Sequence, residues 1–164
     1  MKKFLTLFII LGITSCTNET TDSETVSTDK DKTYNWRLVT SWPKNYPGLG
    51  MAPERIADLV EEMSDGQMTI TVYGAEEQVP AFGVFDAVSS GSHQMGHSGG
   101  YFWKGKVPAA QFFTSVPFGL TADEINAWVN RGGGLELWRE IYKPFNIYPI
   151  PVSYTHLRAH ETNS

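Results

Sequence analysis

TYNWRLVTSW, at residues 33–42, is followed along the chain by a helix-like pattern at 52–63 and by MTITVY at 68–73. In the first and last of these segments, aromatic and β-branched residues recur at alternate positions, which is typical of half-buried strands. The middle segment has apolar residues at helical spacing, namely Ala52, Ile56, Leu59, Val60 and Met63. A strand, a helix and a second strand in this order predict a unit of a parallel sheet covered by helices.

The alternation of elements continues toward the C-terminus. A helix is predicted over residues 81–90, with apolar positions Phe82, Phe85, Ala87 and Val88. Gly91 closes this helix, and residues 93–97 predict a short third strand. The β-α-β-α-β order therefore indicates an α/β fold with a parallel-rich sheet.

Two more helices are predicted after an apolar run at residues 112–116. Thr121 and Glu124 have the spacing of a capping box, which opens a helix that includes Ile125, Trp128 and Val129. Three glycines at 132–134 interrupt the pattern, which resumes over 135–142. Residues 147–152 are predicted to be extended.

Composition excludes several classes of protein. The chain has 164 residues, a formal charge of -5 and 13% aromatic residues, which indicates one globular unit with a core. Its 13 scattered cations do not supply the clustered basic surface that nucleic acid binding needs, so no nucleic acid partner is expected. A single cysteine excludes an internal disulfide framework and a cysteine-rich zinc site.

The first 32 residues resemble the leader of an exported lipoprotein. Two lysines precede an apolar run at 4–13, which is too short to span a bilayer, and residues 1–15 are interpreted as a signal peptide. The run leads into a lipobox-like Ile-Thr-Ser-Cys, so Cys16 is expected to carry lipid and anchor the protein to a membrane. The alternative is an ordinary signal peptide followed by a free thiol. Polar residues 16–32 predict a disordered tether.

The last residues, 153–164, differ in composition from the rest of the chain. They resemble translated adaptor sequence and are interpreted as a non-native tail. His156 and His160 within this tail are four residues apart, a spacing that could chelate a metal on a helix. No acidic third ligand accompanies them by pattern, so a metal site is not favoured.

Two motifs could indicate chemistry. Gly96-His97-Ser98-Gly99-Gly100 matches the nucleophile elbow, with Ser98 as nucleophile, but the aromatic, Gly- and Pro-containing residues that follow do not predict the helix that an elbow requires. A tight loop is the better reading. His93 and His97 would share one face of a strand, where hydrogen-bonded histidines are favoured over a ligand pair.

Aromatic residues follow the predicted strands, where open α/β sheets bind ligands. They are Trp42, Tyr46, Tyr101, Phe102 and Trp103. Core packing explains such residues equally well.

Six separated segments resemble, in order and spacing, the DctP-type solute-binding proteins of TRAP transporters. They are TSWP (40–43), MSDG (63–66), FDAV (85–88), MGH (95–97), YFWKGK (101–106) and VPFGLT (116–121). The resemblance is strongest to the branch that binds 2-oxo acids such as pyruvate together with sodium. The loop at 75–80 departs from the branch pattern at Glu76 and Gln78.

The resemblance implies a receptor rather than an enzyme, with a fold like one lobe of a type II periplasmic binding protein. Residues 33–152 would form the first lobe and the approach to the hinge, with Tyr101 hydrogen-bonding the substrate and Trp42 and Phe102 as walls. The expected partners are a small carboxylate and the TRAP permease, in the periplasm. Family members are longer, and their clamping arginine and cation ligands follow this lobe, so we expect a truncated chain without its own metal ligands that binds weakly.

Two alternatives remain at this point. The chain could be a small serine hydrolase that uses Ser98, or a surface lipoprotein that serves only for interaction.

Overall fold

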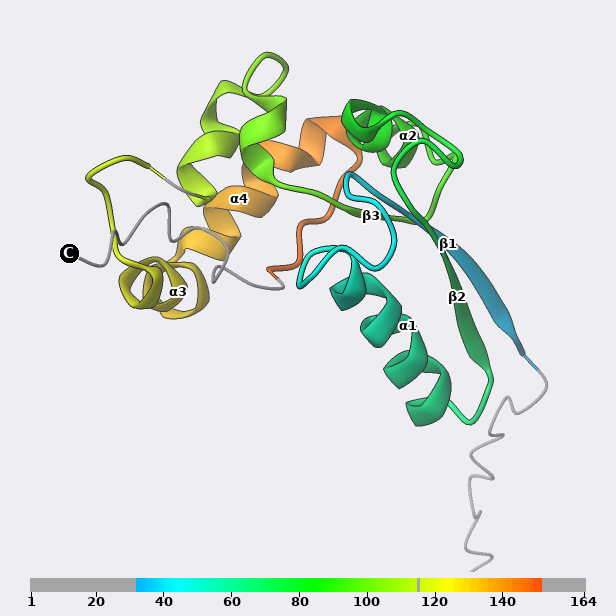
Figure 1. The fold of residues 1–164 in the computed structure, drawn as a ribbon. Helices are drawn as coiled ribbons and strands as arrows, with labels where there is room; N and C mark the ends of the chain where they lie inside the picture. The colour runs from blue at the N-terminus through cyan, green and yellow to red at the C-terminus, as the bar shows by residue number, and fades with distance from the viewer. Residues whose placement is uncertain (1–31, 115, 152–164) are drawn as a thin grey trace, which may run out of the picture.

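A computed structural model describes residues 32–114 and 116–151, and the predicted signal peptide, Cys16 and the tail at 153–164 lie outside them. Three strands form one parallel sheet in the order β2-β1-β3, with bounds β1 Tyr34–Thr40, β2 Met68–Tyr73 and β3 Met95–His97. The helices that lie between the strands in sequence connect them and pack on them, as Figure 1 shows. The predicted parallel α/β architecture is confirmed.

β1 is the central strand. It pairs with β2 from Tyr34↔Met68 to Val39↔Tyr73, and with β3 only over Leu38–Thr40. The first half of β1 therefore has an unpaired edge, and its residues are exposed up to Arg37. Two hydrogen bonds cover part of this edge, because the Arg37 amide donates to Gln94 Oε1 and its guanidinium donates to the Ser92 carbonyl.

Successive residues of β1 pack into different cores because side chains of a strand alternate between the two faces. Leu38 packs with Ile70 and Val72 against α1 (Met51–Met63). Val39 packs on the other face into a cluster that includes Phe85 and Trp103. Both faces of the sheet are therefore covered in its carboxyl half. This half of the sheet positions the candidate site.

Two details of the sequence prediction are wrong in the middle of the chain. The helix predicted over 81–90 is a 3-10 turn, η1 (Ala81–Gly83), followed by α2 (Val84–Ser89), and the Phe82 side chain is 66% exposed instead of buried. The backbone of Pro80 is extended, and the 3-10 turn that follows it ends at Gly83. Phe82 therefore lies before α2 begins and is not on the buried face of that helix. His93 lies before β3 and is buried, so it does not share a strand face with His97.

A helical part follows the sheet. It consists of η2 (Gly100–Trp103), η3 (Pro108–Phe113), α3 (Ala122–Arg131), α4 (Gly134–Tyr142) and η4 (Lys143–Phe145). Phe113 lies between two indole rings, Trp128 of α3 and Trp138 of α4, and is stacked on both. This three-ring stack joins the two helices to η3. Residues 147–151 have no regular structure, and Ile147 packs against the main core.

The turn between α3 and α4 depends on the three glycines. Gly133 has a φ of 84°, which favours glycine, and a methyl group at Gly134 would lie 2.9 Å from the Trp128 ring. The predicted interruption of the helix is confirmed. Within residues 32–114 and 116–151, none of the helices has the length and apolar character needed to cross a membrane.

The predicted capping box is confirmed at the start of α3. Thr121 Oγ1 accepts from the Glu124 amide at 3.4 Å, and Glu124 Oε2 accepts from the Thr121 amide at 2.8 Å. Replacing Thr121 by Ala removes the cap, and we expect a loss of about 1 kcal/mol in the free energy of unfolding at pH 7, measured by urea denaturation. The control is Glu140→Ala, at an exposed position in α4 (Gly134–Tyr142), which should change the free energy of unfolding by less than about 0.5 kcal/mol.

The effect of Thr121→Ala should also depend on pH. Hydrogen bonds from the Thr121 amide and hydroxyl lower the pKa of Glu124. A lowered carboxyl pKa stabilises the fold at neutral pH, and this contribution is lost as the pH falls through the folded-state pKa. The difference between wild type and variant should therefore shrink on acidification. A difference that grows would contradict this role of Glu124.

Candidate ligand-binding site

The candidate site lies at the carboxyl ends of β1 and β3. Because the two strands are parallel and adjacent, Ser41 and Trp42 after β1 come to the same edge as Ser98 after β3. The Ser41 amide donates to the His97 carbonyl at 3.0 Å, which extends the pairing by one residue. This edge is where an open parallel sheet is expected to bind a ligand.

Five rings gather at this edge, and we call them the carboxyl-edge cluster: Trp42, Phe82, His97, Tyr101 and Phe102. Phe102 is their centre, with ring centroids 4.5 Å from Tyr101, 5.2 Å from Phe82 and 6.1 Å from Trp42. Trp42 also lies 5.0 Å from the His97 ring. The structure therefore brings together all three ring residues that the sequence suggested for substrate contact, Trp42, Tyr101 and Phe102.

Tyr101 owes its place to a neighbouring glycine. A methyl group at Gly99 would lie 2.5 Å from Cε1 of the Tyr101 ring and 3.0 Å from its hydroxyl oxygen. The ring therefore rests on the bare backbone of Gly99, and burial raises the pKa of the Tyr101 phenol. The phenol stays protonated at neutral pH, so it can donate a hydrogen bond.

Ser98 does not have the surroundings of a nucleophile. The residues after it form the 3-10 turn η2 rather than the α-helix of an elbow. Its hydroxyl lies 2.6 Å from the Ser41 hydroxyl, which itself donates to the Ala81 carbonyl at 2.7 Å. The nearest histidine in sequence, His97, has its Nδ1 3.3 Å from Thr40 Oγ1. Ser98 is thus a link in a structural hydrogen-bond chain.

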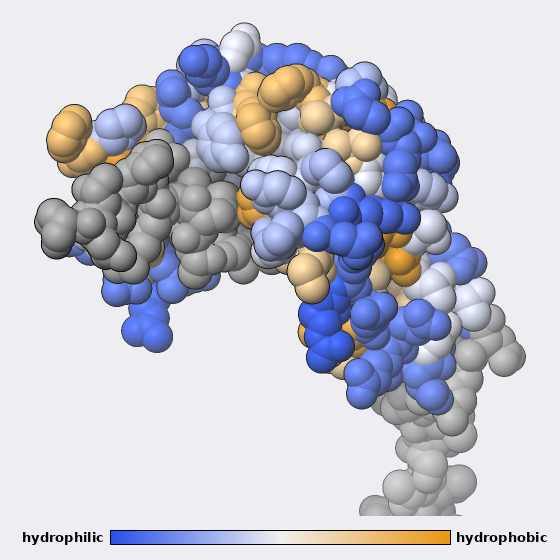
Figure 2. Space-filling view, viewed as in Figure 1, coloured by the Kyte–Doolittle hydropathy of each residue, from blue (hydrophilic) through white to orange (hydrophobic). Residues whose placement is uncertain are grey.

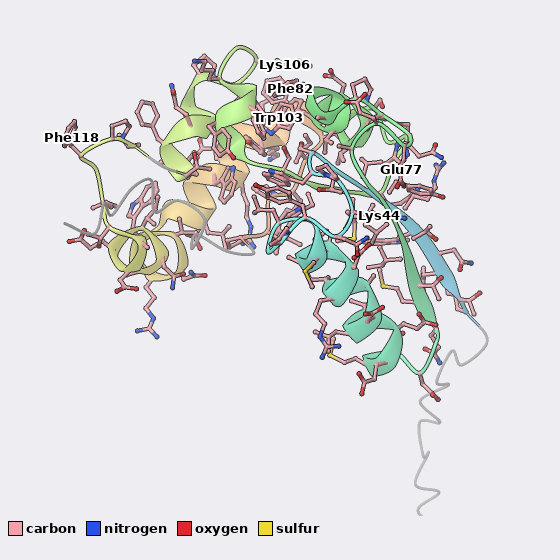
Figure 3. All side chains as sticks on the ribbon, viewed as in Figure 1. Lys44, Glu77, Phe82, Trp103, Lys106 and Phe118 are labelled. Atoms are coloured by element: carbon pink, nitrogen blue, oxygen red, sulfur yellow. The ribbon has the colours of Figure 1, made fainter. Side chains whose placement is uncertain are left out.

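Phe82 and His97 are members of the cluster that the sequence did not assign to the substrate. The sequence pattern places Phe82 on the apolar face of a helix, and it pairs His97 with His93. Their positions in the sequence could have pointed to the site. Phe82 follows β2, and His97 ends β3 at the carboxyl edge. Of the other aromatic candidates, Trp103 is buried in the core against Phe85 at 5.4 Å, and Tyr46 is half exposed. Figure 3 labels Phe82 and Trp103.

The described residues do not fit a cation site built from acidic or histidine side chains. Within 32–114 and 116–151, no three His, Cys, Asp or Glu side chains come together. His93 is buried near the opposite end of β3, with its Nδ1 3.2 Å from Ser92 Oγ. Burial and then the charge of Arg37 lower its pKa, so it stays neutral at neutral pH.

The family model of bacterial extracellular solute-binding protein, family 7, called DctP, matches residues 38–154. The chain belongs to this family. The match begins at Leu38, within β1, and continues through the last described residues, so it includes the whole carboxyl-edge cluster. DctP proteins bind solutes and are not enzymes, which removes the hydrolase alternative for Ser98. The description of the family is that of an extracellular protein of bacteria.

One curated relative is a monocarboxylate 2-oxoacid-binding periplasmic protein of Nostoc sp. strain PCC 7120. It is 41% identical over 144 residues, which are 88% of this chain and 38% of the relative. This DctP chain therefore spans less than two-fifths of the relative's length.

Solved structures of TRAP periplasmic solute-binding proteins share the fold. One from Pseudoalteromonas atlantica T6c, with bound sodium and pyruvate, is 48% identical with a TM-score of 0.71, and the match covers 73% of this chain and 36% of that one. One from Colwellia psychrerythraea, with bound calcium and pyruvate, is 44% identical with the same TM-score, covering 73% and 37%. The DctP fold inferred from the sequence is confirmed.

Proposed function

We propose that this chain forms the first lobe, residues 33–152, of an extracytoplasmic TRAP receptor that captures a small 2-oxo acid such as pyruvate. The observation that carries the proposal is the carboxyl-edge cluster, in which Trp42, Tyr101 and Phe102 meet at the ligand-binding edge of a parallel sheet. Relatives at 48% and 44% identity hold pyruvate, which supports this class of ligand. Delivery of the loaded solute to a membrane permease is part of the proposal.

The roles of the three residues follow from their chemistry. The Tyr101 phenol donates a hydrogen bond to a carboxylate or keto oxygen, and its partial burial raises its pKa, so the phenol keeps the proton that this bond needs. Trp42 and Phe102 supply apolar walls for the methyl end of a short 2-oxo acid. We expect a second lobe to supply a bidentate arginine and the ligands of a shared cation. The carboxyl-edge cluster contains no arginine, and the described residues gather no acidic or histidine ligand set.

Membrane attachment is a further part of this proposal. Cys16 would carry lipid, and residues 16–32 would serve as a polar tether between the membrane and the lobe. Incorporation of a radioactive fatty acid during expression tests this, with Cys16→Ala as the matched control. Labelling of the variant equal to that of wild type would contradict lipidation at Cys16.

Ligand capture is tested in two stages. First, the 164-residue chain is titrated with pyruvate in sodium chloride while tryptophan fluorescence is recorded. We expect a weak response or none, because none of the five residues of the carboxyl-edge cluster is an arginine or a lysine that could pair with the anion. A micromolar response would contradict the need for a second lobe.

In the second stage, residues 33–151 replace the matching lobe of the Pseudoalteromonas atlantica protein, and pyruvate binding is measured by calorimetry. We expect binding by this chimera, and about a tenfold loss of affinity on Tyr101→Phe, because one hydrogen bond to a charged ligand is lost. Tyr148→Phe is the control, since that exposed ring lies against Arg139 and outside the carboxyl-edge cluster. If the chimera is folded but does not bind pyruvate, the assignment as a 2-oxo acid receptor is refuted, and a lipoprotein that serves only for interaction is favoured.

A further inference from the structure

The amide and the carbonyl of Ala81 are both hydrogen-bonded to side chains, one from five residues earlier and one from forty residues earlier. Its amide donates to Glu76 Oε1 at 3.0 Å, and its carbonyl accepts from Ser41 Oγ at 2.7 Å. Glu76 belongs to the loop after β2, whereas Ser41 follows β1. Ala81 is therefore tied to both strand ends at the carboxyl edge.

The direction of the hydroxyl chain follows from counting protons. A serine hydroxyl has one hydrogen to donate, and that of Ser41 goes to Ala81. In the 2.6 Å contact between Ser41 and Ser98, Ser98 must then be the donor. Ser98 thereby orients the Ser41 hydroxyl toward Ala81, which accounts for a hydroxyl that the ligand-binding proposal leaves unused.

Glu76 adopts an unfavourable backbone conformation to reach Ala81. Its φ is 68°, a region that residues other than glycine seldom occupy. Its amide donates to the Val79 carbonyl at 3.1 Å, which closes the loop, and its carboxylate then faces Ala81. A strained residue whose side chain makes a specific contact points to a positional role.

Phe82 is the residue that this arrangement positions. It follows Ala81 in the three-residue turn η1, is 66% exposed, and has an edge contact with Phe102 at 5.2 Å. A ring with so much exposure has little packing of its own to hold it. Its place in the carboxyl-edge cluster therefore depends on the backbone of its neighbour.

We propose that Glu76 and Ser41 are positioning residues that hold Ala81, and through it Phe82, at the rim of the ligand site. The proposal rests on the proposed function only in treating the carboxyl edge as the ligand site. The positioning itself is a property of the free chain, so it is tested without ligand, and its failure is distinct from a failure to bind pyruvate.

The first test measures amide hydrogen exchange of Ala81 by NMR in the 164-residue chain. Glu76→Ala removes the acceptor, and we expect exchange of the Ala81 amide to become about tenfold faster. Glu76→Gln keeps an acceptor oxygen and should stay within about twofold of wild type. The control is Glu77→Ala, because Glu77 is a neighbouring exposed carboxylate paired with Lys44 at 3.5 Å (Figure 3). Equal rates in Glu76→Ala and wild type would overturn the proposal.

The second test reports on the ring. Phe82 is replaced by 4-fluorophenylalanine, and its ¹⁹F resonance is recorded in the Ser41→Ala, Ser41→Thr and Glu76→Ala backgrounds. We expect the signal to move toward that of the free amino acid in both Ala variants and to stay in place in Ser41→Thr, which retains a hydroxyl. An unmoved signal in both Ala variants, with unchanged circular dichroism, would show that Phe82 needs no such support.

Discussion

Replacing Phe113 by Ala should lower the free energy of unfolding by about 3–5 kcal/mol, the largest loss that we expect from any single truncation in this fold. Phe113 is 1% exposed and lies between two indoles, 5.5 Å from Trp128 at 13° and 5.3 Å from Trp138 at 5°. Removing the ring leaves a cavity and also ends both stacking contacts. Because the stack joins η3, α3 and α4, these three elements should pack more loosely on one another.

The matched control is the preceding residue. Phe112 is 57% exposed, so Phe112→Ala should change the free energy of unfolding by less than about 1 kcal/mol. Urea denaturation followed by tryptophan fluorescence measures both variants, and only Phe113→Ala should also shift the emission of the native state. Equal losses in the two variants would contradict the assignment of the stack as the joint of the helical part.

Replacing Gly100 by Ala should cost about 1–3 kcal/mol through overpacking. A methyl group at Gly100 would lie 2.7 Å from the Ala110 carbonyl oxygen and 3.4 Å from Thr114 Cγ2. The first of these is a backbone atom that cannot rotate away, so η2 and η3 must separate. Since η2 carries Tyr101 and Phe102, the change should also disturb the carboxyl-edge cluster.

Gly105→Ala is the control for this prediction. A methyl group at Gly105 meets no atom within 4 Å, and Gly105 is not among the residues with positive φ. This variant should match or slightly exceed the stability of wild type, because alanine has a smaller conformational freedom to lose on folding. Thermal unfolding and the ¹³C spectrum of labelled tyrosine compare the two variants. A destabilised Gly105→Ala, or a silent Gly100→Ala, would contradict the packing described here.

The sequence predicted most of the elements because local patterns agree with their tertiary environments. In MTITVY at 68–73, Ile70 and Val72 are buried toward α1 and Thr71 between them is exposed, and β2 occupies those same residues. The capping box at Thr121 is likewise decided by neighbours in sequence. Phe82 and His93 were misplaced because their burial depends on turns whose geometry the hydrophobic pattern does not report.

The site could be predicted as a place but not as a set of contacts. The rule that parallel sheets bind ligands at their carboxyl ends leads to Trp42, Tyr101 and Phe102. It does not lead to Glu76, whose role follows from a φ of 68° and a bond to an amide five residues later. Ser98 is the opposite case. It lies in a five-residue motif typical of a nucleophile, but its hydroxyl donates a hydrogen bond to the Ser41 hydroxyl.

Among the described residues, Phe118 is the most exposed of the large apolar residues. Phe118 has a positive φ and is fully exposed, at the tip of the segment between η3 and α3. Figure 2 shows a hydrophobic group at the left end of the molecule, where Figure 3 labels Phe118, whereas the surface over α1 is mostly hydrophilic. This tip shields nothing in the described part of the chain, so Phe118→Ser should leave the free energy of unfolding within about 0.5 kcal/mol of wild type.

The strand order β2-β1-β3 also governs when the chain can fold during synthesis. β1 leaves the ribosome before its partners, yet Tyr34 pairs with Met68 and Leu38 pairs with Met95, so no neighbouring strand is at hand. Contacts this distant in sequence form slowly, because a long loop must close before any pairing energy is gained. The first strand pairing therefore becomes possible only when β2 has emerged, and TYNWRLVTSW has no strand partner throughout that interval.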